Sequence, residues 1–270
     1  MIDKLNLTIY RPPDINYLEL NGTITESSRD KFYKYLCVLD KCKAFYRPHK
    51  FSDEINFSIP YTKIDINPKY FESYDHMETY LFSIFESDDS KCDIRAESFN
   101  VSRIDIAADI ADFPFDILLS TLRIKRIRTE SLSFYKGTIY AGTNPKIRIY
   151  EKLREIKDRL KKGYEITAYE QSLVESSKSH TRFEIQIRNA RKTLHGVTDD
   201  PASFASYYDR LEFFDFKENG DRGVLQILYK YINRKFRDEL EKYKNHSIVT
   251  EIKDTYVNGV KEWFKYQEPF

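Results

Sequence analysis

VSRIDIAAD, residues 101–109, is the stretch that decides the expected fold, because its apolar and polar side chains alternate one by one. Ile104 and Ile106 point to one side, whereas Arg103 and Asp105 point to the other. Period-two alternation is typical of a strand with one buried face. We therefore expect a sheet that carries charged side chains on its other face.

Two further segments repeat this pattern, KIRIYEK at 146–152 and TRFEIQIR at 181–188. Their polar faces hold, in turn, Lys146, Arg148, Tyr150 and Lys152, then Arg182, Glu184, Gln186 and Arg188. If the three strands are neighbours, one face of the sheet gathers carboxylates, cations and a tyrosine. Such a set suits metal-assisted attack on a phosphodiester.

The whole chain predicts an α+β fold. We expect a largely antiparallel central sheet with the active site on one face, helices packed on the other, and a helical carboxy-terminal region. A boundary is expected near residue 200, between a sheet domain at 1–200 and a helical region at 201–270. Further strands are expected at 3–10, 61–66, 132–135 and 138–141, and helices at 27–39, 70–86, 153–162, 201–214, 223–243 and 246–266.

Composition limits the possible classes of protein. The 270 residues include 44 Lys and Arg against 43 Asp and Glu, a net charge of +1, so there is no overall basic signal for nucleic acid. The amino terminus lacks a secretory signal and no apolar run approaches the length of a membrane span. We therefore expect a cytoplasmic protein without a membrane partner. There is no phosphate-binding loop, and hence no helicase activity in the chain itself.

The acids in these strands have two possible explanations. Asp105 and Asp109 lie four residues apart on one strand face, roughly 13 Å along it, so they cannot share one ion unless the strand bends or ends. The simpler explanation is a solvated face on which Arg103 pairs with an acid. Asp is a poor strand former, however, which favours a functional reason for its position. Carboxylates of this kind suit Mg²⁺ or Mn²⁺ better than zinc.

Tyr150 is one of 21 tyrosines, but its surroundings distinguish it. Arg148 and Lys152 share its face, and positive charge favours a phenolate. Residues 146–162 contain eight Lys or Arg and three Asp or Glu. Such a run is either a solvated helix face or part of a groove that follows a phosphate backbone.

The order of these motifs resembles a known family. The run consists of Arg103-Ile104-Asp105 with Asp109, Tyr140-Ala141-Gly142, Arg148-Ile149-Tyr150-Glu151-Lys152 with Glu155, and Arg182-Phe183-Glu184-Ile185. It is similar to the rolling-circle plasmid replication initiators of the Rep_trans type, and shares parts with relaxases of integrative elements and with filamentous-phage initiators. Lys63-Ile64-Asp65-Ile66-Asn67-Pro68 also looks like a strand of that family.

The resemblance implies a function and a role for each site residue. The chain would be an origin-specific DNA endonuclease and strand transferase that initiates rolling-circle replication. Residues 1–200 would be its catalytic nicking and joining domain, and residues 201–270 a helical region for DNA recognition or dimerisation. Tyr150 would attack one strand, giving a 5′-phosphotyrosine and a free 3′-OH, and the strand would later be rejoined. Lys152 and Glu155 match the family's Y-x-K-x-x-E spacing and would complete the catalytic group.

The resemblance also implies a cofactor and partners. Mg²⁺ or Mn²⁺ would be held by Asp105, Asp109 and Glu184, with Asp65 as a further candidate where related proteins often carry Glu. The expected DNA contacts come from Arg103, Arg148, Arg182, Arg188 and Lys146. The expected partners are plasmid or phage origin DNA, as duplex and as a single-stranded nick site, a host helicase, and a second copy of the chain in a homodimer.

Three alternatives stay open at this point. The same chemistry serves a relaxase of a conjugative or mobilisable element, and sequence does not separate the two. A non-catalytic DNA-binding regulator could keep the fold without nicking. Finally, an unrelated α+β protein could simply expose these polar strand faces to solvent.

Overall fold

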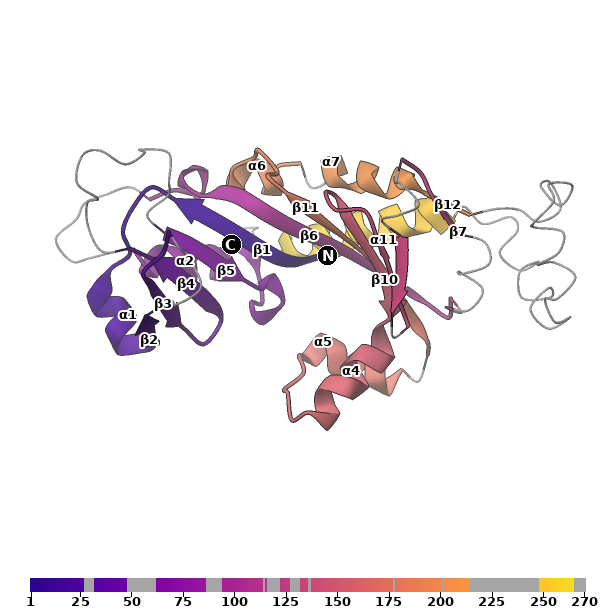
Figure 1. Cartoon of the computed structure of the whole chain (residues 1–270), viewed down its shortest axis with the longest axis horizontal. Coiled ribbons are helices and arrows are strands. Elements are labelled where there is room, and N and C mark those ends of the chain that lie inside the picture. The colour runs from indigo at the N-terminus through magenta and orange to yellow at the C-terminus, as the bar shows by residue number, and fades with distance from the viewer. Residues whose placement is uncertain are drawn as a thin grey trace, which may run out of the picture. The chain divides into compact units, whose positions relative to one another are not determined.

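The structure, a computed structural model, describes residues 1–26, 32–47, 62–85, 94–113, 115, 122–126, 132–135, 137–176, 178–200, 202–213 and 248–264. The chain divides into two compact units, each drawn from separate stretches. The amino-terminal unit consists of Ile2–Ile106, Ile187–Pro201 and Val260–Phe270. The carboxy-terminal unit consists of Met1, Ala107–Gln186 and Ala202–Gly259. Figure 1 gives the labels used below.

The amino-terminal unit is built on a sheet with strand order β2-β3-β4-β5-β1-β6. The strands are β1 (Ile2–Ile9), β2 (Thr23–Glu26), β3 (Tyr35–Val38), β4 (Cys42–Tyr46), β5 (Thr62–Ile66) and β6 (Asn100–Ala111), whose last residues lie in the other unit. The helices are α1 (Ile15–Asn21), α2 (Tyr74–Ser83), α6 (Leu194–Thr198) and the 3-10 turns η1 (Pro68–Tyr70) and η2 (Ala96–Ser98).

Alternation of apolar and polar side chains along β1 and β5 produces the core of this unit. In their antiparallel register Leu7 lies opposite Ile64 and both are buried, whereas the polar Asn6 lies opposite Asp65 on the other face. The helices begin at polar caps: Asp14 accepts hydrogen bonds from two backbone amides at the start of α1. One sheet face therefore carries the apolar core and the other carries polar side chains.

The carboxy-terminal unit has a sheet of strand order β6-β11-β10-β9-β8 and a second sheet of two strands, β12-β7. Its strands are β7 (Leu122–Ile124), β8 (Leu132–Tyr135), β9 (Thr138–Ala141), β10 (Lys146–Glu151), β12 (Leu211–Phe213) and β11 (His180–Arg188), whose last two residues lie in the amino-terminal unit. Its helices are α4 (Lys152–Lys161), α5 (Ala168–Glu175), α7 (Ala202–Ala205), the 3-10 turn η4 (Ser206–Arg210) and α11 (Ile248–Phe264), whose last turn lies in the other unit.

Pairing of β10 with β11 sets the polar face of this second sheet. The antiparallel register places Ile149 opposite Phe183 on the buried face and Arg148 opposite Glu184 on the polar face. Directly after β10 the chain turns into α4, which lies beside α5 (Figure 1). Leu153, Ile156 and Leu173 form the apolar contact that joins the two helices.

The α+β class, with a largely antiparallel sheet and a helix near the carboxyl terminus, is confirmed, as are strands at 101–109, 146–151 and 181–188. The prediction of a helix at 27–39 is wrong for Tyr35–Val38, because these residues form β3 and pair with β2 and β4. Sheet pairing overrides the helical spacing of its apolar residues. The helix expected at 201–214 is replaced by α7, η4 and β12. The helix expected at 223–243 lies outside the described residues.

The division of the chain also differs from the expected boundary near residue 200. A change of unit does fall there, between Pro201 and Ala202. However, Ala202–Gly259 groups with Ala107–Gln186 rather than forming a region of its own. Contacts between segments distant in sequence, rather than sequence position, define these two units.

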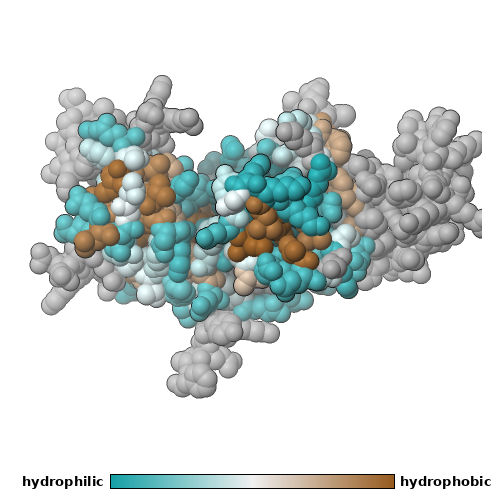
Figure 2. Space-filling model, turned by 90° about the horizontal axis from the view of Figure 1, so that it is seen from below, coloured by the Kyte–Doolittle hydropathy of each residue, from teal (hydrophilic) through white to brown (hydrophobic). Residues whose placement is uncertain are grey.

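In the described part of the chain, no helix is both long and apolar enough to cross a membrane. The surface in Figure 2 shows apolar patches bordered by polar side chains. Single exposed apolar residues such as Leu20 are ordinary on folded proteins.

Replacement of Leu7 by alanine should lower the free energy of unfolding by about 2–5 kcal/mol, because a fully buried leucine leaves a cavity. Leu20→Ala is the matched control, since Leu20 is 85% exposed and its loss should change stability by less than about 0.5 kcal/mol. Urea unfolding followed by circular dichroism measures both. Equal effects of the two substitutions would contradict the assigned core.

Candidate active site

Tyr150, Glu184 and Arg148 lie side by side on the polar face of β10 and β11. The Tyr150 hydroxyl donates a hydrogen bond to Oε2 of Glu184 at 3.2 Å. Glu184 is buried and forms an ion pair with Arg148, the residue opposite it in the strand register. Tyr150 itself is half-buried. A phenol therefore meets a carboxylate that can accept its proton, next to a guanidinium that can stabilise negative charge.

Tyr150 lines a cleft of about 400 Å³. Strands β9 and β10 form one side, and α4 forms the other. The lining residues are Gly137, Thr138, Tyr140, Arg148, Tyr150, Glu151, Arg154, Glu155, Asp158, Arg159 and Lys162. The cations among them are Arg148, Arg154, Arg159 and Lys162, and the carboxylates are Glu151, Glu155 and Asp158. Helix α4 therefore brings charges of both signs to the tyrosine.

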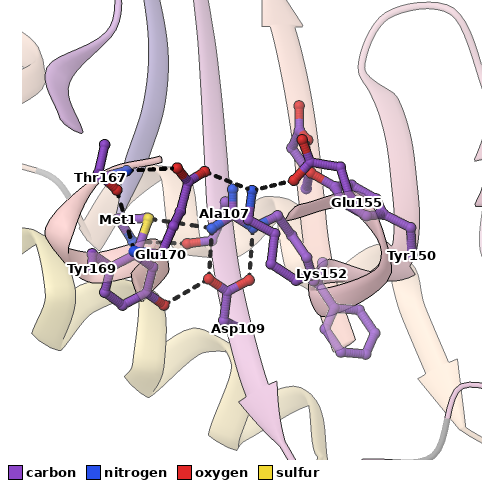
Figure 3. Close-up of polar contacts among 12 residues, drawn as sticks. Met1, Ala107, Asp109, Tyr150, Lys152, Glu155, Thr167, Tyr169 and Glu170 are labelled. Atoms are coloured by element: carbon purple, nitrogen blue, oxygen red, sulfur yellow. Dashed lines mark hydrogen bonds and ion pairs between the residues drawn. The ribbon is translucent and has the colours of Figure 1, made fainter. Parts of the chain in front are cut away.

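A cluster of four charged residues supports α4 beside the cleft. Lys152 Nζ lies 2.6 Å from Glu155 Oε2 and 3.3 Å from Glu170 Oε1 (Figure 3). Arg159 donates to the same Glu170 oxygen at 2.6 Å. Lys152 and Glu170 are both buried. A lysine at the first position of a helix faces the positive end of the helix dipole, so its burial depends on these carboxylates.

Asp109 and Arg182 form a second buried pair. Arg182 donates to both carboxylate oxygens of Asp109 at 2.6 Å, and the Tyr169 hydroxyl donates to Oδ2 at 2.7 Å (Figure 3). Burial alone would raise the pKa of Asp109, but the charge of Arg182 and the hydrogen bonds from Arg182 and Tyr169 outweigh it and hold that pKa below its usual value. Burial, followed by the charge of Asp109, raises the pKa of the Tyr169 phenol.

The other predicted site residues are distributed over both units. Asp105 lies in the amino-terminal unit, where it is fully buried and bonded to Arg103 through both oxygens. Asp65 is in the same unit and pairs with Lys4 at 2.9 Å. Arg188, also in that unit, is exposed.

Lys146, in the carboxy-terminal unit, places its ammonium 5.1 Å from the ring centroid of Tyr140. Of the five arginines and lysines expected to contact DNA, Arg148 is the one that lines the Tyr150 cleft. Arg182 is only 2% exposed, so a direct DNA contact would require its pair with Asp109 to open.

The three expected metal ligands do not form a donor set for a divalent ion as they are arranged. Asp105, Asp109 and Glu184 each face an arginine. A guanidinium neutralises a carboxylate and repels a second cation, so a divalent ion would bind any of the three acids only if its arginine moved away.

Sequence reasoning missed Glu170, Arg159 and Tyr169. One signal could have revealed Glu170, because Thr167 and Glu170 form a reciprocal capping box at the start of α5. The spacing of Thr and Glu three residues apart before a helix is readable in sequence. No sequence pattern links Tyr169 to Asp109, since 60 residues separate them.

Comparison with known proteins gives no assignment. No family model, no curated protein and no solved structure matches this chain.

Replacement of Asp109 by asparagine should lower the free energy of unfolding at neutral pH by about 3 kcal/mol, because it leaves the buried Arg182 without a counter-ion. The pKa of Asp109 is lowered in the folded state, so its contribution is fully present above the unfolded value of about 4 and is lost as pH falls through the folded value. The two proteins should therefore converge in stability at acid pH. Urea unfolding at neutral and acid pH measures this.

Asp209→Asn is the matched control for that substitution. Asp209 pairs with Lys253 at 2.8 Å but is 58% exposed, so its loss should cost less than about 1 kcal/mol. A difference between Asp109→Asn and the parent protein that stays constant down to acid pH would contradict the ion-pair explanation.

Proposed function

We propose that the chain is a DNA strand transferase that nicks and rejoins one strand through Tyr150, as a rolling-circle replication initiator does. The observation that carries the proposal is the 3.2 Å hydrogen bond from the Tyr150 hydroxyl to the buried Glu184, at the wall of a cleft lined by four cations and three carboxylates. The order of motifs that resembles the Rep_trans initiators supports the same nucleophile.

Tyr150 and Glu184 supply the nucleophile and the proton acceptor of the proposed reaction. The Tyr150 oxygen attacks a backbone phosphorus while its proton passes to Glu184. A bond forms between that oxygen and phosphorus, and the bond from phosphorus to the 3′ oxygen breaks. The 3′ oxygen leaves and takes a proton from solvent, which gives a 5′-phosphotyrosine and a free 3′-OH. Rejoining is the reverse reaction.

Arg148 supplies the electrostatic part of this mechanism. Its guanidinium lies against Glu184 and lines the cleft, so it faces the position of a phosphate beside Tyr150. A fixed cation there would stabilise the charge that develops on the phosphate oxygens. A single strand fits this site better than duplex, because the target phosphate must reach a half-buried hydroxyl.

The remaining parts of the proposal rest on the resemblance. They are a requirement for Mg²⁺ or Mn²⁺, recognition of duplex origin DNA, a host helicase and a homodimer. For a metal to bind Glu184, the ion pair with Arg148 would have to open. A relaxase of a conjugative or mobilisable element would use the same cleft in the same way.

Replacement of Tyr150 by phenylalanine should abolish nicking, because it removes only the attacking oxygen. The assay uses supercoiled plasmid carrying DNA from the neighbourhood of the chain's own gene, with Mg²⁺, Mn²⁺ or EDTA. Tyr164→Phe is the control, since Tyr164 is 61% exposed and does not line the cleft. Wild-type protein and the control should nick and remain attached to a 5′ end.

Two outcomes would contradict this proposal. Nicking by Tyr150→Phe would mean that another residue attacks. DNA binding without nicking by the wild type would favour the non-catalytic regulator. The EDTA arm tests the metal separately, because nicking that persists in EDTA would rule out the metal requirement and leave the tyrosine assignment intact.

Replacement of Glu184 by glutamine should lower the nicking rate by roughly 10²–10⁴-fold, the usual contribution of a positioned base. DNA affinity should not fall, because the substitution removes a negative charge beside Arg148, which lines the cleft. Single-turnover nicking at saturating enzyme measures the rate, and fluorescence anisotropy of a labelled oligonucleotide measures binding. An unchanged nicking rate would remove Glu184 from the mechanism.

A further inference from the structure

We propose that Tyr140 is a stacking platform for a nucleotide base, in the subsite next to the phosphate that Tyr150 attacks. The inference rests on the proposed function, since it describes how the same cleft holds a single DNA strand. It adds Tyr140 as a residue that contacts substrate, with an unstacked base as the chemical group that it recognises.

The strand register places Tyr140 beside the nucleophile. On β9, Thr138 lies opposite Tyr150 and Tyr140 lies opposite Arg148. Tyr140 is therefore two residues along the strand from the partner of Tyr150, about 7 Å, and on the same face of the sheet. Both tyrosines line the one cleft. A group held against Tyr140 would be a close neighbour of a phosphate held against Tyr150 and Arg148.

The chemistry of the cleft singles out this ring. Of the described residues that line it, Tyr140 and Tyr150 are the aromatic ones, and the others are charged, hydroxyl-bearing or glycine. Tyr140 therefore supplies the flat apolar surface in a cleft otherwise suited to a sugar–phosphate backbone. Aromatic rings interleaved with cations are the usual means of binding single strands, because bases stack on the rings and phosphates contact the cations.

Lys146 supplies the cation that belongs with such a platform. Its ammonium lies 5.1 Å from the ring centroid of Tyr140, where the electron-rich face of the ring attracts it. The four-carbon stem of lysine lets the charge move from the ring to a flanking phosphate when a base arrives. Stacking needs the ring and not the hydroxyl, which separates the role of Tyr140 from that of the nucleophile Tyr150.

The test compares two labelled probes on full-length protein carrying Tyr150→Phe, so that no cleavage occurs. One probe is a 20-nucleotide oligothymidine, and the other is the same sugar–phosphate chain without bases. Kd for each is measured by fluorescence anisotropy at fixed salt. The variants added to this background are Tyr140→Ala, Tyr140→Phe and the control Tyr135→Ala. Tyr135 is an exposed tyrosine on β8 that does not line the cleft.

We expect oligothymidine to bind more tightly than the base-free chain. Tyr140→Ala should weaken oligothymidine binding about tenfold, the loss produced by one base–aromatic stack, and should leave the base-free chain nearly unchanged. Tyr140→Phe and Tyr135→Ala should behave like the parent protein. Tyr140→Phe keeps the ring, so normal binding by this variant would show that Tyr140→Ala loses affinity because it loses base stacking.

Other results overturn the inference and can be told apart from failure of the proposed function. If Tyr140→Ala binds oligothymidine as tightly as the parent, or weakens both probes equally, the platform is wrong even where the wild type nicks plasmid. If Tyr140→Phe loses binding, the hydroxyl acts and stacking is wrong. If neither probe binds, the platform is wrong. If stacking is seen but the wild type never nicks, the proposed function fails and the platform stands.

Discussion

The antiparallel register between β10 and β11 is the constraint on which the rest of the candidate site depends. It sets Arg148 opposite Glu184 and brings the Tyr150 hydroxyl within 3.2 Å of the Glu184 carboxylate. A shift by one residue would turn every one of these side chains to the apolar face, where Ile149 and Phe183 now lie. The hydrophobic pattern of the two strands therefore selects the register, and the register in turn assembles phenol, carboxylate and guanidinium.

Four buried carboxylates, those of Asp105, Asp109, Glu170 and Glu184, each face a cation. Asp105 has Arg103, Asp109 has Arg182, Glu184 has Arg148, and Glu170 has Lys152 and Arg159. Removing one partner of such a pair costs more than the pair contributes, because an uncompensated charge is left in a medium of low polarity. This explains why acids and arginines alternate along the same strands.

Much of the sheet could be predicted from sequence, because period-two alternation at 101–109, 146–151 and 181–188 is a local signal. The sequence predicts that Tyr150 lies near Glu184 only if their two strands are neighbours. Neither segment alone shows which strand it pairs with. The contact of Tyr169 with Asp109 could not be predicted from sequence, because tertiary packing brings together residues that are 60 positions apart. β3 was mistaken for a helix because apolar spacing on a short segment suits both, and pairing with β2 and β4 decides between them.

The absence of a loop between β10 and α4 has a mechanical consequence. Glu151 ends the strand and Lys152 begins the helix, so Tyr150 and the α4 side of its cleft belong to one continuous, hydrogen-bonded length of chain. That length is held at its far side by the charge cluster around Glu170. Strand β9, which carries Thr138 and Tyr140, is itself paired with β10, so both sides of the cleft are anchored to the strand that bears Tyr150. In the proposed reaction, a DNA end joined to Tyr150 would therefore keep a fixed position relative to both walls.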